Sequence, residues 1–389
     1  MKTKLQFLFS GLALLASVYQ AAAQLPVISS FSQNGVLVCS NLQPGSVASV
    51  QWASSLSGPW TNWAGSEGLD SVTVNSNSTI TVSVPMFYRV CGVAQTNSTP
   101  TFTADGMALI PAGTFMIGDV NDNNQAEDAA PTNVYVSAFY MDTNLVSLSQ
   151  WQGVYSYATG QGYSFLNAGT DNAANDPVVQ VDWFDCVKWS NARSQQAGLT
   201  PVYYTDAGLT QVFTNGDSGT TVYANWGANG YRLPTEAEWE KAARGGLSGQ
   251  RFPWGNTLFE SQANYYGCMS DCGFSYDFGP NGYNTNFDTG SQPYTSPVGY
   301  FAPNGYGLND MAGNVFEWCW DWYWEPPYPA GCPYLGGTDP RGPVEPSGFR
   351  ILRGGSWDDF ADYARCANRY YSRPIFPNSD VGFRCVRGL

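Results

Sequence analysis

The sequence predicts an α+β protein with little regular secondary structure, preceded by a small all-β module. The 389-residue chain contains 42 Gly, 24 Tyr and 14 Trp, and only 12% of it is charged. Disordered segments lack so many aromatic residues, so this composition indicates ordered, irregular loops held by aromatic packing. Three segments carry helix signals, whereas residues 24–97 alternate short β-type runs with turn residues.

Residues 1–23 have the pattern of a signal peptide. Lys2 and Lys4 precede a mainly apolar run over 5–18, and three alanines at 21–23 are typical of a cleavage site. The alternative, a membrane anchor, needs roughly 18 apolar residues, and no later segment is apolar enough to cross a bilayer. We therefore expect a protein without a membrane span that is secreted, periplasmic or on the cell surface.

The chain is acidic and contains no histidine. Its formal charge of −14 becomes −16 when Lys2 and Lys4 leave with the signal. An acidic surface repels the phosphates of nucleic acids but is compatible with bound Ca²⁺. The lack of histidine excludes Ser-His-Asp and Cys-His catalysis, His-ligated zinc and facial-triad iron sites.

Nine cysteines in an exported chain predict disulfides with at least one thiol left over. The sequence leaves the pairing open. The candidate bridges are Cys268 with Cys272, Cys319 with Cys332, and Cys39 with Cys91. A zinc site that includes Cys268 and Cys272 is the alternative for those two residues.

Residues 24–97 predict a small β-sandwich of the fibronectin type, in which we find no chemistry. Its β-type runs, separated by turn residues, are 36–39, 47–52, 71–74, 79–84 and 87–90. A linker is expected at 98–105, followed by a second domain at 106–389.

Three helices are predicted in this second domain. Thr235 and Glu238 have the spacing of a capping box, and the helix after them is expected to stop at Gly245. The other two helices are expected after Asp182, ending before Gly198, and over 148–158 after Ser147.

Eight segments of the second domain recur in the order and spacing of a known family. They are IPAGTFMIG at 110–118, PVVQVDW at 177–183, YRLPTEAEWE at 231–240, FPWGN at 252–256, NGYGL at 304–308, MAGNVFEW at 311–318, RGGSW at 353–357 and GFR at 382–384. Residues 106–389 thereby resemble the formylglycine-generating-enzyme (sulfatase-modifying factor) family. The resemblance implies a C-type-lectin-like α+β fold with a central twisted sheet.

The resemblance also implies structural Ca²⁺. One family site combines backbone carbonyls with a Glu side chain, a donor set that suits a hard cation. The corresponding residues are Ala312, Gly313, Val315 and Glu317. A salt bridge or a cap is the alternative role for Glu317. A second family site corresponds to Asn264, Tyr265 and Asp288.

The family's catalytic residues are missing. Members that oxidise a sulfatase cysteine carry two cysteines, five apart, that bind copper(I) after the Gly-Gly-Ser-aromatic segment. The corresponding positions are Asp359 and Ala364, or Ala361 for the second when counted back from Cys366. None is cysteine, so no copper is expected, and iron-dependent relatives need histidine. By the same resemblance Cys366 and Cys385 correspond to disulfide-forming cysteines, with Cys186 as a partner for either.

The segment after Ser356 predicts a ligand-binding face. Residues of framework type, such as Arg365 and Arg369, alternate with residues reachable from an Asn codon by changes at adenines alone. This second set is Asp358, Asp359, Phe360, Asp362, Tyr363, Tyr370, Tyr371, Ser372, Ile375, Phe376, Asn378, Ser379 and Asp380. Trp357 adjoins it, and Trp318, Trp320 and Trp322 either line the same face or lie in the core.

This pattern resembles the variable region of proteins diversified by diversity-generating retroelements, which display a binding face on a lectin-like fold. Tyr and Phe provide contact area, and Asp, Asn and Ser provide adaptable hydrogen bonds. The alternative is an ordinary Asn/Asp-rich surface loop. We therefore expect an exported, non-catalytic protein that binds a macromolecular or cell-surface ligand. Two further functions remain open: a formylglycine-generating oxidoreductase using a pair such as Cys319 and Cys366, and a structural envelope protein.

Overall fold

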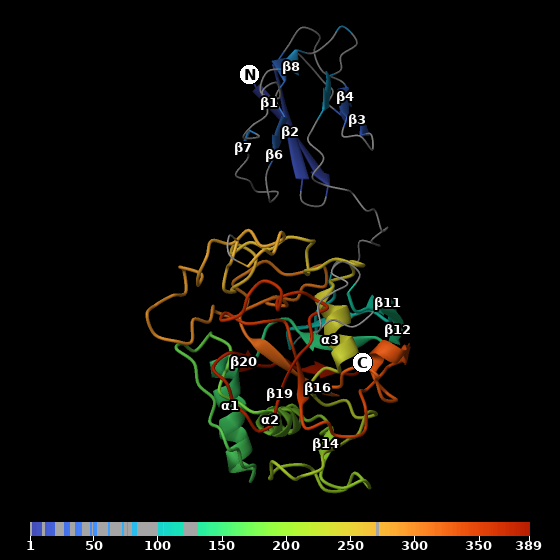
Figure 1. Cartoon of the computed structure of the whole chain (residues 1–389), viewed down its shortest axis with the longest axis vertical. Coiled ribbons are helices and arrows are strands. Elements are labelled where there is room, and N and C mark those ends of the chain that lie inside the picture. Colours follow the sequence, from blue (N-terminus) through green and yellow to red (C-terminus); the bar gives the residue numbers. More distant parts are fainter. Residues whose placement is uncertain are drawn as a thin grey trace. The chain divides into compact units, whose positions relative to one another are not determined.

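The computed structural model describes residues 100–389 except 104, 120–130 and 270–271, together with the strands of the first 83 residues (Figure 1). The chain divides into two compact units, Met1–Ala94 and Gln95–Leu389.

The elements described in the first unit are all strands. They are β1 (Lys2–Phe9), β2 (Leu12–Tyr19), β3 (Val27–Phe31), β4 (Val36–Ser40), β5 (Val47–Ala48), β6 (Val50–Trp52), β7 (Thr61–Asn62), β8 (Val72–Thr73) and β9 (Ile80–Ser83). They pair in the orders β1-β2-β6-β7, β3-β4-β9 and β5-β8. Four predicted runs coincide with β4, with β5 and β6, with β8 and with β9. The fifth run and the Cys39–Cys91 bridge lie outside the described residues.

Strands β1 and β2 pair antiparallel within the segment that the sequence assigns to the signal peptide. This pairing describes the chain before any cleavage and does not test whether residues 1–23 are removed. Export therefore remains a prediction. Within the described residues, no helix has both the length and the apolar character that crossing a membrane requires.

The second unit combines three α-helices with short strands. In chain order they are β10 (Met107–Ile110), β11 (Gly113–Ile117), β12 (Thr132–Val136), β13 (Phe139–Asp142), α1 (Leu148–Gly160), α2 (Trp183–Gln196), β14 (Tyr203–Tyr204), β15 (Tyr223–Ala224), α3 (Glu236–Ala243), β16 (Phe316–Trp322), a 3₁₀ turn η1 (Pro333–Leu335), β17 (Gly337–Thr338), β18 (Arg350–Arg353), β19 (Tyr370–Ser372), β20 (Val381–Gly382) and β21 (Val386–Arg387). Long loops join them, as the composition predicts. Of the predicted linker, Phe102 bridges Ala108 of β10, so the domain begins before residue 106.

All three predicted helices are present, with the expected caps. In the capping box of α3 the Thr235 hydroxyl accepts the Glu238 N–H at 3.2 Å, and Glu238 Oε2 accepts the Thr235 N–H at 2.9 Å. The side chains of Ser147 and Asp182 cap α1 and α2 in the same way. Each cap satisfies a backbone N–H that the first helical turn leaves without a partner.

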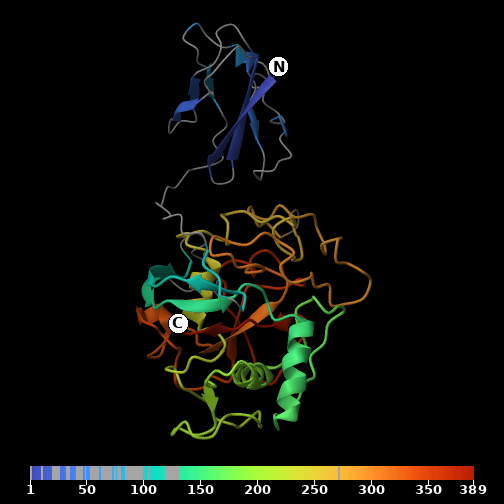
Figure 2. The same cartoon turned by 180° about the vertical axis from the view of Figure 1, so that it is seen from behind.

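A four-stranded sheet, β19-β18-β16-β20, lies between the helices. Side chains alternate across it, as the twofold period of a strand requires. Trp318 and Leu352 share one apolar cluster with α1 and α2, whereas Cys319 and Ile351 share another with α3. Figures 1 and 2 show α1 and α2 together on one side of this sheet and α3 on the other. Trp318 is therefore a core residue.

Buried ion pairs fix α3 to the central sheet. Glu240 is completely buried and accepts hydrogen bonds from Gly118 N at 2.8 Å, from Arg244 Nη2 at 2.6 Å and from Arg353 of β18. One turn earlier, Glu236 binds Arg369 Nε at 2.7 Å. Two carboxylates on one helix face are thus neutralised by three arginines from separate parts of the chain.

Replacing Glu240 by Gln should destabilise the second unit by about 3–5 kcal/mol, because Arg353 and Arg244 would keep their buried charges without this carboxylate. Unfolding of the full chain in denaturant, followed by near-ultraviolet circular dichroism, measures the effect. The matched control is Glu325→Gln at an exposed position, where a change within about 0.5 kcal/mol is expected. Equal effects of the two substitutions would contradict this role of Glu240.

Candidate functional site

The predicted binding segment starts from β18 at a glycine pair. Gly354 and Gly355 have φ values of +99° and +72°, a region that favours glycine. A Cβ atom on Gly355 would lie 2.9 Å from the backbone nitrogen of Ala364. This close approach folds 356–364 into a compact loop, after which the chain forms β19, crosses a second loop and enters β20.

Exposure separates the two kinds of residue over 358–372, but not beyond: Arg373, Pro374 and Pro377, which are also of framework type, are exposed or partly exposed. All thirteen members of the predicted ligand-binding set are partly or fully exposed. Arg365, Cys366, Ala367 and Arg369, by contrast, are buried. Only the adjoining Trp357, 2% exposed, departs from the predicted face, because it packs inward. Over 358–372 the alternation along the sequence thus corresponds to an alternation between surface and core, whereas both kinds of residue lie at the surface over 373–380.

Four carboxylates converge at the start of this face. The field of Asp358, Asp362 and Asp380 acts on Asp359, whose Oδ2 accepts a hydrogen bond from Ser356 Oγ. Burial, with a further contribution from these carboxylates, raises the pKa of Asp359 from 3.8 to about 7. Burial also raises the pKa of Asp380.

Aromatic residues from 264–294 complete this end of the face. Tyr283 donates its hydroxyl to Asp358 at 2.7 Å, and this bond raises the pKa of Tyr283 to about 12. Its ring lies 5.7 Å from Trp357, and the Tyr266 ring packs edge-on against Phe360 at 5.5 Å. Sequence reasoning missed Tyr266 and Tyr283. The sequence signal that could have identified them is the concentration of tyrosine in the loop between the FPWGN and NGYGL segments.

The rest of the predicted set continues along β19. Tyr363 packs edge-on against Tyr370 at 5.5 Å, and Phe316 stacks on Tyr370 at 5.0 Å. Tyr371 stacks instead on Tyr323, at 4.2 Å. Ile375, Phe376 and Asn378 lie exposed on the loop before β20.

Trp320 and Trp322 contact Arg350, which lies opposite Trp322 on one side and opposite Ser372 of the predicted set on the other. Trp320 stacks on Tyr203 at 5.4 Å, and both tryptophans contact the guanidinium of Arg350, which lies 3.5 Å from the Trp322 ring centroid. Their cation–π contacts form a cluster near the end of β16.

The cysteines pair less than the sequence predicts. Cys268 and Cys272 form a disulfide with an S–S distance of 2.02 Å, which removes the thiolates that a zinc site there would need. The bridge predicted between Cys319 and Cys332 is wrong, since both are buried free thiols in the same apolar cluster.

The bridge expected from Cys186 to Cys366 or Cys385 is also not formed, and all three are buried free thiols. Cys385 Sγ instead lies 3.5 Å from the Ser190 hydroxyl, one helical turn beyond Cys186.

The first predicted Ca²⁺ site retains usable donors. Glu317 Oε2 pairs with Arg384 Nε at 2.8 Å, so the salt bridge given as its alternative role is present. Glu317 Oε1 is buried and makes no close hydrogen bond, although the Trp239 side chain interacts with this carboxylate. No described residue donates a hydrogen bond to the carbonyls of Ala312 and Gly313. Free carbonyl and carboxylate oxygens of this kind fit a Ca²⁺ ion, with the nearby Val315 carbonyl as the remaining predicted donor.

The second predicted set, which would use the Asn264 side chain, the Tyr265 carbonyl and Asp288, stays a prediction. The Asn264 carbonyl accepts the Asn314 N–H at 2.7 Å, and Asp288 is exposed. The buried carboxylate beside Tyr265 is Asp277, which accepts the Tyr265 hydroxyl and the Cys268 N–H, both at 2.7 Å. Among the described residues, no three His, Cys, Asp or Glu side chains form a metal-binding group.

The fold and this segment define a class: a lectin-like α+β domain of the formylglycine-generating-enzyme type. Residues 93–389 match the sulfatase-modifying factor enzyme 1-like domain family, and the chain belongs to that family. It is 34% identical over 302 residues to a formylglycine-generating enzyme of Thermomonospora curvata, covering 74% of this chain and 95% of the relative. The Bos taurus enzyme is 33% identical over 297 residues, covering 72% and 74%.

A solved structure extends the likeness. Treponema denticola variable protein 1 superposes with a TM-score of 0.53 at 29% identity, covering 73% of this chain and 95% of that one. These comparisons confirm the family resemblance and the fold class that the sequence predicts.

Asp359→Asn should stabilise the protein in a pH-dependent way. Since the folded-state pKa lies above the ordinary value, ionising Asp359 lowers stability as the pH rises from about 4 to about 7. The variant should therefore gain about 1–3 kcal/mol over the wild type at pH 8 and almost nothing at pH 4, because each pKa unit corresponds to roughly 1.4 kcal/mol. Thermal unfolding at the two pH values measures this, and a pH-independent difference would contradict the assignment.

We propose that Ca²⁺ occupies the Glu317 site, and calcium removal should then lower the Tm. A ligand at one hundred times its Kd stabilises the native state by about 2.7 kcal/mol. Thermal unfolding in CaCl₂ and in EDTA tests this, with MgCl₂ as the ion control. Glu317→Gln should abolish the difference between CaCl₂ and EDTA whatever its own Tm. An identical wild-type Tm in both solutions would rule out the ion.

Proposed function

We propose that this protein is an exported, non-catalytic binding protein that recognises a macromolecular or cell-surface ligand through the face at 357–380. The observation that carries the proposal is the separation described above. Every residue of the predicted ligand-binding set is at least partly exposed, whereas the framework residues at 365–367 and 369 are buried. Aromatic rings beside short polar side chains are typical of adaptable binding surfaces.

The residues at the family's catalytic positions support a non-catalytic role. Asp359 offers a hard carboxylate already bound to Ser356, and Ala364 offers only a methyl group, whereas copper(I) prefers thiolates. The alternative pair is equally unsuited. Burial raises the pKa of Cys319 well above its usual range and that of Cys366 to about 12. Thiols in this state are protonated at neutral pH and react slowly.

We further propose that the thirteen-residue set is diversified between variants of the protein. Substitutions at exposed positions leave the core and its ion pairs intact, so the scaffold tolerates them. The similarity to a protein named variable protein 1 supports this proposal. Sequences from several isolates would test it, because substitutions should concentrate at the thirteen positions and spare the buried ones.

The competing function is formylglycine generation, which the names of the relatives in Thermomonospora curvata and Bos taurus favour. The full chain would be incubated with copper(I), O₂ and a Cys-x-Pro-x-Arg peptide, with the Thermomonospora curvata enzyme as positive control. Mass spectrometry should show an unchanged peptide. Conversion of its cysteine to an aldehyde would overturn the non-catalytic proposal.

The same preparation serves for binding to an array of cell-surface glycans and proteins. A ligand found there should bind at least about tenfold more weakly to Phe360→Ala or Phe376→Ala, since exposed aromatic residues often dominate interfaces. Tyr300→Ala is the matched control, because Tyr300 is 57% exposed and lies outside the set. Equal losses in all three variants would show that the ligand binds elsewhere.

A further inference from the structure

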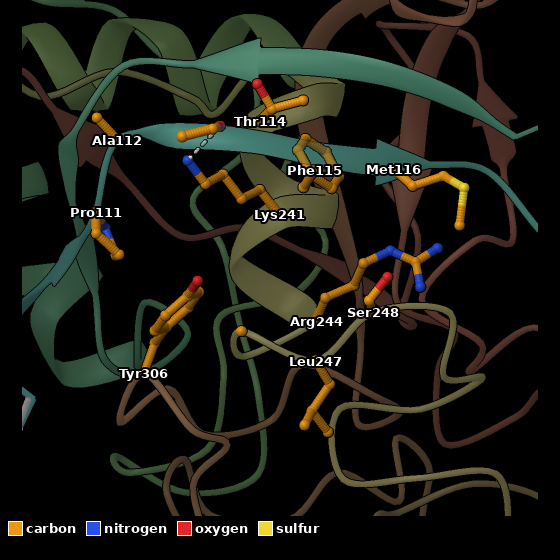
Figure 3. Close-up of a pocket in the computed structure, with 12 residues that line it drawn as sticks. Pro111, Ala112, Thr114, Phe115, Met116, Lys241, Arg244, Leu247, Ser248 and Tyr306 are labelled. Carbon is orange, nitrogen blue, oxygen red and sulfur yellow. Dashed lines mark hydrogen bonds between the residues drawn. The ribbon is translucent and has the colours of Figure 1, made fainter. Parts of the chain in front are cut away.

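A pocket of about 200 Å³ lies between β11, the C-terminal end of α3 and the segment around Tyr306 (Figure 3). Pro111, Phe115 and Leu247 contribute apolar walls, and Lys241 and Tyr306 contribute polar atoms. None of these residues belongs to the predicted binding face or to either metal set. The pocket is smaller than the roughly 300–1,000 Å³ that drug-sized ligands occupy, so it fits a smaller molecule.

Lys241 is a buried cation without a counter-ion among the described residues. Its side chain is 5% exposed, and its ammonium donates to the carbonyls of Gly113 and Val136, both at 3.0 Å. An ammonium has three donors, so one N–H remains. Arg244, one turn later, contrasts with it because its charge is balanced by Glu240 at 2.6 Å. Burying an unpaired charge is costly, and an anion in the pocket would offset that cost.

Tyr306 supplies a second donor. Its hydroxyl makes no hydrogen bond to a described residue, and Figure 3 shows it turned toward the end of the Lys241 side chain. The ring packs against the apolar cluster that contains Ala242 and Leu308, and hydrogen bonds fix the backbone that carries it. Asn304 accepts the Tyr306 N–H at 2.9 Å and donates to the Ala242 carbonyl of α3 at 2.8 Å. The two donors are therefore positioned before any ligand arrives, which reduces the entropy lost on binding.

We propose that this pocket binds a small carboxylate that carries a short apolar group. The Lys241 ammonium and the Tyr306 hydroxyl donate to the carboxylate oxygens, and the apolar group lies against Phe115 and Leu247. Charge-assisted hydrogen bonds of this kind are roughly twice as strong as neutral ones, so the anion is preferred over its neutral amide. The source is either a free acid or the C-terminus of a peptide chain.

The charge state of Lys241 agrees with this chemistry. Burial lowers its pKa to about 8, against the opposing fields of Asp339 and Glu238. The ammonium is therefore still mostly protonated at neutral pH and is available to an anion.

The test is titration of the full chain with sodium butyrate, followed by saturation-transfer NMR. Wild-type protein should show saturable binding, and butyramide should show none. Lys241→Met should weaken butyrate binding at least about tenfold, and Tyr306→Phe about threefold to tenfold, as loss of a charge-assisted bond predicts. Tyr300→Phe, an exposed tyrosine outside the pocket, should leave binding unchanged.

A second probe, N-acetyl-glycyl-leucine, distinguishes the two sources of the carboxylate. Tighter binding of butyrate identifies a free acid, and tighter binding of the dipeptide identifies a chain end; both support the site. The absence of saturable binding of either probe to folded wild type, or its retention in Lys241→Met, overturns the proposal. Tyr306→Phe provides a second test if Lys241→Met fails to fold, because this hydroxyl makes no hydrogen bond to any described residue and its loss should leave the fold intact.

Discussion

The rest of the second unit depends on the two buried carboxylates of α3. Glu240 and Glu236 hold Arg353 of β18, Arg369 before β19, and Arg244 after the helix. Each charge is buried, so removing one partner would leave another buried charge unpaired. The free-energy cost of an unpaired buried charge favours a single arrangement of helix and sheet. Because Glu236 holds Arg369 in the core, the chain enters β19 directly after a fixed, buried residue, and Tyr370, Tyr371 and Ser372 are partly exposed. A stability constraint on α3 thereby shapes the binding face.

The face also shows how one family scaffold can support different functions. Function resides in the residues placed on a fold rather than in the fold itself. Here a hydrogen-bonded Asp359 and the methyl group of Ala364 stand where relatives carry reactive cysteines. The loop is closed by Tyr266 and Tyr283 from a distant segment. The same position in the fold carries aromatic and acidic side chains, as the proposed recognition surface requires.

The α3 helix connects this face to the Lys241 pocket. Lys241 directly follows Glu240, and Arg244 both pairs with Glu240 and lines the pocket. One helix therefore carries two kinds of charge on adjacent positions: a carboxylate paired with arginines and an ammonium that has no ion-pair partner in the part of the chain that the structure describes. The first stabilises the fold, and the second leaves a donor for a ligand. The difference arises from which side of α3 faces the sheet and which faces the pocket.

The sequence by itself determined the helix starts, the family fold and the alternation along 358–372, and it offered the bridge between Cys268 and Cys272 as one of the candidates. These features depend on neighbours within a few residues or on an ordered set of segments. Only the tertiary structure decided that Trp318 lies in the core, that Asp277 accepts the Tyr265 hydroxyl, and that Cys319 and Cys332 stay apart. It alone brought Tyr306 to Lys241. Such contacts join irregular loops distant in the chain, and loops without periodicity carry no local signal of their partners.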